Sequence, residues 1–307
     1  MGSTSQGEQR FWDNYEKWKG SYFVPRDFLR VDWKSRKYRG TKRGFRNLTS
    51  VMKRSLKTLL LSKGKHPGSR TIKALHWRGL VDEDGNLTDH GKTLALTRLS
   101  LRAQCQFLDL PLETWQVGSL DSPENAVQMM LEEQGLQAYF VENTFGLFID
   151  YVIGHATVAV ARKLDKRIFT LNLPNDPELF FWVKRDLEKY LDRLDEDHCK
   201  GNRPICDPFL QTLITDRPLS RLYALFEAMY RSLTVERVRS LLRMYFANPL
   251  AYNYRGWPDL FVAQNHAPYC IEVKTTDKLH LNQLVTIPDL VKYTGLPVKV
   301  VRLSESR

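Results

Sequence analysis

Two acids and a lysine near the C-terminus stand at a spacing that could hold a metal ion beside a phosphate. Asp259 opens one β-prone run, and Glu272 and Lys274 lie near the end of the next, residues 269–273. Alternate residues of a strand share a face, so Glu272 and Lys274 are predicted to point the same way and Val273 the other. Carboxylate oxygens, joined by the Val273 carbonyl, suit Mg²⁺ or Mn²⁺. Such a cation polarises a phosphate and activates a bound water, and the lysine would position that water and stabilise charge.

Each of these residues also has an ordinary structural explanation. An Asp at the start of a strand is often a turn residue, and a Glu and a Lys two positions apart often form a solvated pair. Here the neighbours Cys270, Ile271 and Val273 are apolar, which predicts a largely buried strand. Because burying charge costs free energy unless the charge is paired or binds a metal, the combination favours a functional site.

The last fifty residues carry these positions in one order: Gly256-x-Pro258-Asp259-Leu260, Glu272-x-Lys274, Asp277 and Gln283. This order resembles the VRR-NUC branch of the PD-(D/E)xK nucleases, and the resemblance covers roughly residues 121–307. It implies a restriction-endonuclease-like α/β (α+β) core that hydrolyses DNA phosphodiesters, with Asp259 and Glu272 as metal ligands. It also implies that Gln283 helps to orient the lysine or a phosphate.

A third acid is predicted from an earlier segment. Glu142 stands inside the apolar run 138–154, just before a predicted helix. Fanconi-associated members of the resembled family carry a metal-site Glu at a comparable helix start, which implies that Glu142 is the third carboxylate. Asn143 replaces the usual glycine there, and Asp150 is the alternative acid. A carboxylate at a helix N-terminus is also common without any catalytic role.

The predicted nuclease domain, residues 119–307, combines strands with a helical insertion. Apolar periodicity predicts helices at 123–134, 145–152 and 279–293 and strands at 260–262, 269–273 and 298–303. The insertion spans 155–250, with helices predicted at 177–194, 219–232 and 235–247. The Fanconi-associated members carry a helical insert at this place that disfavours a dimer, so the resemblance implies a monomer.

The first third of the chain is strongly basic. Residues 1–110 hold 23 Lys and Arg against 10 Asp and Glu, whereas the remainder has slightly more acids than bases. A polyanion would therefore be attracted to the N-terminal region. Within residues 26–46 the bases interleave with Trp33 and Tyr38, which predicts phosphate contacts. The predicted DNA-binding residues here are Arg36, Lys37, Arg39, Lys42, Arg43 and Arg46.

Residues 45–105 resemble a winged helix-turn-helix inside a predicted N-terminal DNA-binding region, residues 1–118. Helices are predicted at 49–62, 70–78 and 88–98, with a small hairpin whose turn is Asp84-Gly85. The second helix of such modules enters the major groove. The alternative is a module that contacts only protein. Residues 104–120 are interpreted as a transition between the two domains. The second helix supplies the remaining DNA-binding candidates, Arg70, Lys73, His76 and Arg78.

The sequence therefore predicts a metal-dependent DNA nuclease, a hydrolase. The resemblance implies that its substrate is branched, flapped or nicked DNA with a 5′ end, in repair or in defence. The alternatives are a sequence-specific restriction-type endonuclease and a non-catalytic DNA-binding protein. No apolar run reaches membrane-spanning length and no secretory signal is evident. The four scattered cysteines predict a reducing compartment, the cytoplasm, with association with the nucleoid if the source is prokaryotic.

Overall fold

The computed structural model describes residues 48–62, 66–142, 144–154, 157, 182–194, 219–247, 256–264 and 267–305. The six predicted DNA-binding residues of the 26–46 segment, part of the insertion 155–250 and the side chain of Asp150 lie outside the described residues. Those six residues are Arg36, Lys37, Arg39, Lys42, Arg43 and Arg46.

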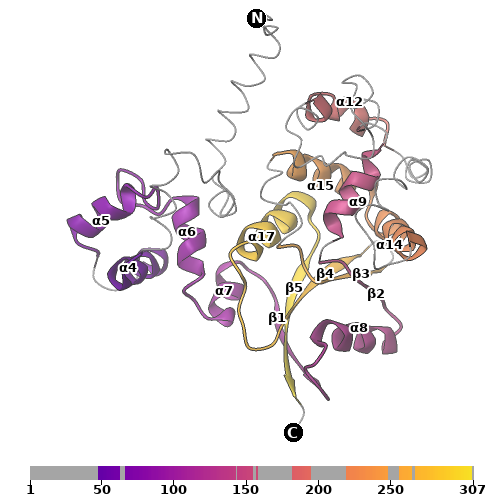
Figure 1. Ribbon diagram of the computed structural model, residues 1–307, viewed down its shortest axis with the longest axis horizontal. Coiled ribbons are helices and arrows are strands. Elements are labelled where there is room, and N and C mark those ends of the chain that lie inside the picture. Colours follow the sequence, from indigo (N-terminus) through magenta and orange to yellow (C-terminus); the bar gives the residue numbers. More distant parts are fainter. Residues whose placement is uncertain are drawn as a thin grey trace, which may run out of the picture.

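A five-stranded mixed sheet forms the centre of the fold, as the predicted α/β class requires (Figure 1). The order across the sheet is β1-β5-β4-β3-β2. The pairs β1–β5 and β4–β5 are parallel, whereas β3–β4 and β2–β3 are antiparallel. The strands are β1 (Leu112–Val117), β2 (Gln137–Phe140), β3 (Leu260–Ala263), β4 (Tyr269–Lys274) and β5 (Val298–Glu305).

Helices cover both faces of this sheet (Figure 1). One face packs under α9, α14, α15 and α17, and its core includes Phe261 and Cys270. The opposite face packs on α8, and its core includes Ile271 and Val273. The helices of this region are α8 (Pro123–Glu133), α9 (Phe145–Val152), α12 (Leu187–Leu191), α14 (Leu219–Ser232), α15 (Val235–Ala247) and α17 (Gln283–Thr294).

Four further helices precede the sheet: α4 (Ser50–Leu61), α5 (Ser69–His76), α6 (Asp89–Leu96) and α7 (Leu101–Phe107). The first three share a small core that includes Leu56, Leu75 and Leu94. Thr49 and Thr88 begin α4 and α6 by accepting a hydrogen bond from the backbone N–H three residues later. The predicted wing is reduced to one antiparallel bridge, Val81 to Leu87.

Two strands and one helix are absent from the sequence prediction. The predicted transition 104–120 contains the end of α7 and the edge strand β1, so the sheet begins before the predicted domain boundary at 118. β2 lies at the start of the apolar run 138–154 and was not separated from it, because its pairing with the distant strand β3 is what makes it a strand. The predicted helix 279–293 begins at Gln283, since residues 275–282 form an irregular segment. Among the described helices, none has both the length and the apolar character needed to cross a membrane.

Candidate active site

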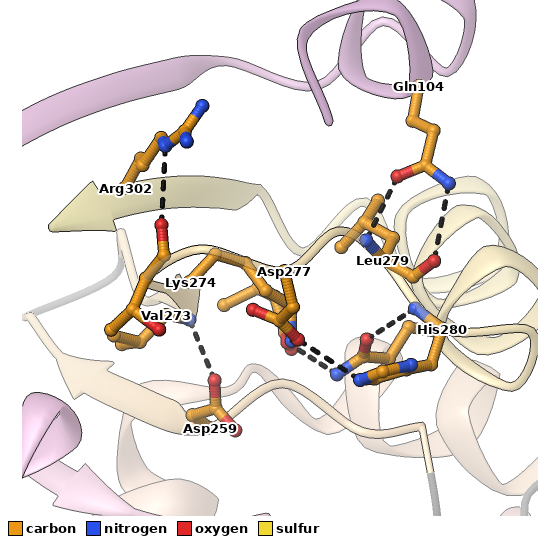
Figure 2. Close-up of polar contacts among 11 residues, drawn as sticks. Gln104, Asp259, Val273, Lys274, Asp277, Leu279, His280 and Arg302 are labelled. Carbon is orange, nitrogen blue, oxygen red and sulfur yellow. Dashed lines mark hydrogen bonds and ion pairs between the residues drawn. The ribbon is translucent and has the colours of Figure 1, made fainter. Parts of the chain in front are cut away.

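The antiparallel pair β3–β4 brings Asp259 beside the end of β4. Asp259 directly precedes β3, is only 6% exposed, and accepts a hydrogen bond through Oδ2 from the Val273 N–H at 2.7 Å (Figure 2). The Asp259 carbonyl in turn accepts from the Val141 N–H at 2.8 Å. The Asp259 carboxylate is therefore fixed from the neighbouring strand, and its backbone is tied to the turn that carries Glu142.

Glu272 and Lys274 lie on one face of β4, as the alternation along the strand predicts, and they form an ion pair. Both side chains share the face of Cys270, which packs under α17, while Val273 packs on the α8 side. The Lys274 Nζ lies 2.6 Å from the Glu272 Oε1. Glu272 is completely buried and Lys274 is 6% exposed, so this ion pair is largely removed from water.

Gln283, the first residue of α17, orients Glu272. Its Nε2 donates to the Glu272 Oε1, and its own Oε1 accepts from the His280 N–H at 2.9 Å. The Gln283 amide is therefore held from both sides. The second oxygen of Glu272, Oε2, is buried and accepts no hydrogen bond from any described residue. A buried carboxylate oxygen without a donor is costly in a folded protein unless another group, such as a cation, satisfies it.

Electrostatics at the site favour the binding of a positive ion. Burial raises the pKa of Asp259 to about 7, although the Val273 N–H and Lys274 lower it in part. Complete burial, and then the charge of Asp259, raises the pKa of Glu272 well above its ordinary value. Burial alone would lower the pKa of Lys274, but Glu272 and the other nearby acids raise it. Lys274 therefore stays an ammonium near neutral pH.

Glu142 lies near Asp259 and Glu272 but does not contact them. Its side chain is exposed, in the turn between β2 and α9. Its charge contributes, as the smallest of the causes, to the raised pKa values of both Asp259 and Glu272. Among the described residues, however, no three His, Cys, Asp or Glu side chains are grouped closely enough to hold a metal ion. The predicted convergence of three carboxylates is thus incomplete, because Glu142 extends into solvent.

The donor set nevertheless fits a hard cation. Asp259 and Glu272 provide carboxylate oxygens, which Mg²⁺ and Mn²⁺ prefer, and the Glu272 Oε2 lacks a protein donor in the described part of the chain. A bound cation would also lower the pKa values of Asp259 and Glu272, which burial raises. The role of the Val273 carbonyl as a further ligand stays a prediction.

The sequence does not reveal the contacts that several residues make near the site. Glu124, near the start of α8, also raises the pKa of Asp259. Trp257, inside the Gly-x-Pro-Asp motif, is fully buried and stacks on Phe145 of α9 with ring centroids 4.8 Å apart. A Cβ on Gly256 would lie 2.6 Å from the Asn282 carbonyl group, so the motif and the start of α17 are in backbone contact. Only three-dimensional contacts reveal these roles.

The predicted DNA-binding residues of α5 lie on an exposed surface. Arg70, Lys73 and His76 are exposed, whereas Arg78 is half-buried and donates from its guanidinium to the Ala74 carbonyl at 2.7 Å. Trp77 was not predicted as a surface residue, yet it is 89% exposed. Arg70 and Lys73 are therefore available to a ligand, whereas the His76 Nδ1 lies 3.2 Å from the Val81 carbonyl and Arg78 contacts the preceding helix.

Comparison with known proteins identifies the fold. No protein-family model matches the chain, and no curated protein matches its sequence. The chain is similar to two crystal structures of paFAN1 bound to 5′-flap DNA with a gap, one with a 2-nt flap and one with a 1-nt flap. The TM-scores are 0.54 and 0.51, and the sequence identities are 16% and 17%. The match covers 98% and 97% of this chain but 62% of each paFAN1 chain, so this chain spans less than two thirds of their length. The mixed sheet with its helices thus shares the fold of these paFAN1 structures.

Proposed function

We propose that this protein is a metal-dependent nuclease that hydrolyses phosphodiester bonds in DNA. The observation that carries the proposal is the buried Glu272 carboxylate, which faces Lys274 at 2.6 Å and leaves one oxygen without a donor among the described residues. A buried carboxylate arranged in this way, beside a second desolvated carboxylate, is expensive for folding alone and is typical of a catalytic site.

Each residue would have a defined role. Asp259, Glu272 and Glu142 would hold Mg²⁺ or Mn²⁺, with Glu142 turning inward from its exposed turn. The bound cation would polarise the scissile phosphate and lower the pKa of a water. Because nearby acids raise its pKa, Lys274 is charged at neutral pH and would stabilise negative charge on the phosphate. Gln283 would hold the Glu272 Oε1, so that Oε2 faces the ligand.

The preferred substrate is proposed to be branched, flapped or nicked DNA with a 5′ end, cleaved by a monomer. This choice is supported by the fold shared with paFAN1, which was crystallised on 5′-flap DNA, and by the basic N-terminal region. The exposed bases Arg70, Lys73 and His76 would contact the duplex backbone.

The test is a panel of labelled hairpin, flap, splayed, junction and linear DNAs, each with Mg²⁺, Mn²⁺ or chelator. Wild-type protein should cleave the 5′-ended branched DNAs only with metal, and Lys274→Met should lose about a hundredfold or more of the rate. Lys299→Met is the matched control, because Lys299 lies on the adjacent strand and pairs with Glu113 at 3.3 Å, outside the site. Discrete fragments from intact duplex would favour a restriction-type enzyme. DNA binding with no cleavage under any condition would refute the nuclease proposal.

A further inference from the structure

An irregular segment, residues 275–282, connects β4 to α17 and holds the site residues from one side. Within it, the Asp277 Oδ2 lies 3.6 Å from the Lys274 Nζ and 3.1 Å from the His280 Nε2. The His280 N–H donates to the Gln283 Oε1 at 2.9 Å. This segment therefore contacts Lys274 through Asp277 (Figure 2). It contacts the Gln283 amide, which orients Glu272, through the His280 N–H.

A single buried side chain from another part of the fold fixes the segment. Gln104, on α7, has no exposed surface. Its Oε1 accepts from the Leu279 N–H at 2.9 Å, and its Nε2 donates to the Leu279 carbonyl at 3.2 Å (Figure 2). The same Nε2 also donates to the Leu96 carbonyl at 3.0 Å. Gln104 thus pairs with both backbone groups of Leu279, as a neighbouring strand would, and joins them to the end of α6.

Lys278, the residue before Leu279, makes a second contact with the same part of the fold. The Lys278 Nζ donates to the Thr97 carbonyl and to the Leu99 carbonyl, the latter at 3.3 Å. Leu279 and Lys278 of the segment are therefore bonded to α7 and to the connection between α6 and α7. Gln104 and Leu279 are 175 residues apart in the sequence. The α6–α7 connection also links the N-terminal helices, through α7, to the sheet (Figure 1).

We propose that Gln104 is a positioning residue for the active site. By pairing with Leu279 it holds the neighbouring His280 N–H on Gln283, and through Gln283 it fixes the Glu272 carboxylate next to Lys274. The proposal rests on the proposed nuclease function for its effect on catalysis. Buried polar networks of this kind hold one geometry when every member is satisfied, and they lose it when one member is removed.

The central variant is Gln104→Met, which keeps the length of the side chain but removes its N–H donors and its oxygen acceptor. For the full chain with Mg²⁺ and a 5′-flap DNA, kcat should fall about tenfold to a hundredfold, because small displacements of reacting groups cost this much. The Kd for the DNA should change less than about twofold, since Gln104 is buried and cannot touch DNA. In metal-free protein, amide hydrogen exchange at Leu279 and His280 should become about tenfold faster or more.

Leu101→Ala is the matched control on the same helix. Leu101 is buried, so its truncation destabilises α7 without removing a hydrogen bond to residues 275–282. At a temperature where both variants are folded, Leu101→Ala should keep the wild-type kcat. Equal losses of kcat in the two variants would mean that Gln104 acts only through stability, and this would overturn the proposal.

Lys278→Met is the second variant, in case the loss of a buried amide prevents folding. Its side chain is partly exposed, so the fold should tolerate the change. Amide exchange at Leu279 should become faster and kcat should fall, both by less than in Gln104→Met. Wild-type exchange at Leu279 and His280 in the variants would refute the positioning role. If wild-type protein cleaves none of the DNAs, the nuclease proposal fails alone, because the exchange measurement still decides whether Gln104 holds the segment.

Discussion

The two charged regions of this protein use charge in opposite ways. At the end of β4, Glu272 and Lys274 are buried and each contacts other polar side chains. On α5, Arg70 and Lys73 are exposed. A buried charge depends on its partners for its ionisation state and its position, whereas an exposed charge acts mainly through the field it adds to a surface.

The difference teaches what each region can contribute. Fixed geometry in a site of low polarity can stabilise a transition state, since no reorganisation is needed at the moment of reaction. Exposed, flexible bases can attract a polyanion of almost any sequence, and their effects add up. Substitutions should therefore have large effects that depend on one another in the β3–β4 site, and small additive effects on α5.

The largest effect is expected from Glu272→Gln, which replaces a buried carboxylate by a neutral group of the same shape. Cleavage of 5′-flap DNA should fall about a thousandfold, because the proposed metal site would lose one of its carboxylate ligands. Thermal stability should change little, since burial raises the pKa of Glu272, which makes its charged form costly in the metal-free protein, and the amide oxygen of the new Gln side chain can still accept from Lys274. Parallel melting curves and cleavage rates check this prediction. A fall in both quantities would mean that Glu272 is structural, and the contrast between the two regions would be lost.

A smaller effect is expected from Gly256→Ala, which tests whether the site needs its backbone contact. Gly256 has a φ of +83°, and an added Cβ would lie 2.6 Å from the Asn282 carbonyl group. The new methyl group must displace Asn282 and with it Gln283 at the start of α17, so the free energy of unfolding should fall by about 2 kcal/mol or more. Denaturant unfolding of Gly256→Ala and Gly68→Ala checks this prediction. Gly68 has a negative φ and no described atom within 4 Å of the added Cβ. Equal stability of the two variants would contradict the close approach.

The same contrast explains which features the sequence predicts. The strands around the site were found because they are short, apolar and β-prone, and the shared face of Glu272 and Lys274 follows from the alternation along β4. The order of the helices and the local basic charge together predicted the bases of α5. Both are local properties, which a few neighbouring residues determine.

What the sequence does not reveal depends on contacts between distant segments. β1 becomes a strand because it pairs with β5, whose residue Val300 lies opposite Leu112. Gln104 looks like an ordinary helix residue until Leu279 is placed against it. The incomplete convergence of Glu142 with the other two acids has the same origin, because the conformation of its turn, and not its residue type, decides where the carboxylate lies.

The smallest effects should come from the exposed bases of α5, where each substitution is expected to act independently of the other. Arg70→Ala and Lys73→Ala should each weaken DNA binding only a few-fold, about equally for every DNA sequence, and should each reduce the salt slope of log Kd by about one. Lys92→Ala is the control on α6, where the lysine pairs with Asp89 at 3.2 Å. Binding titrations at several salt concentrations check the prediction, and the double variant should show the sum of the two single effects. If one substitution instead abolished binding to a single sequence, that base would be fixed and specific like the groups of the site, and α5 would be a sequence-reading element.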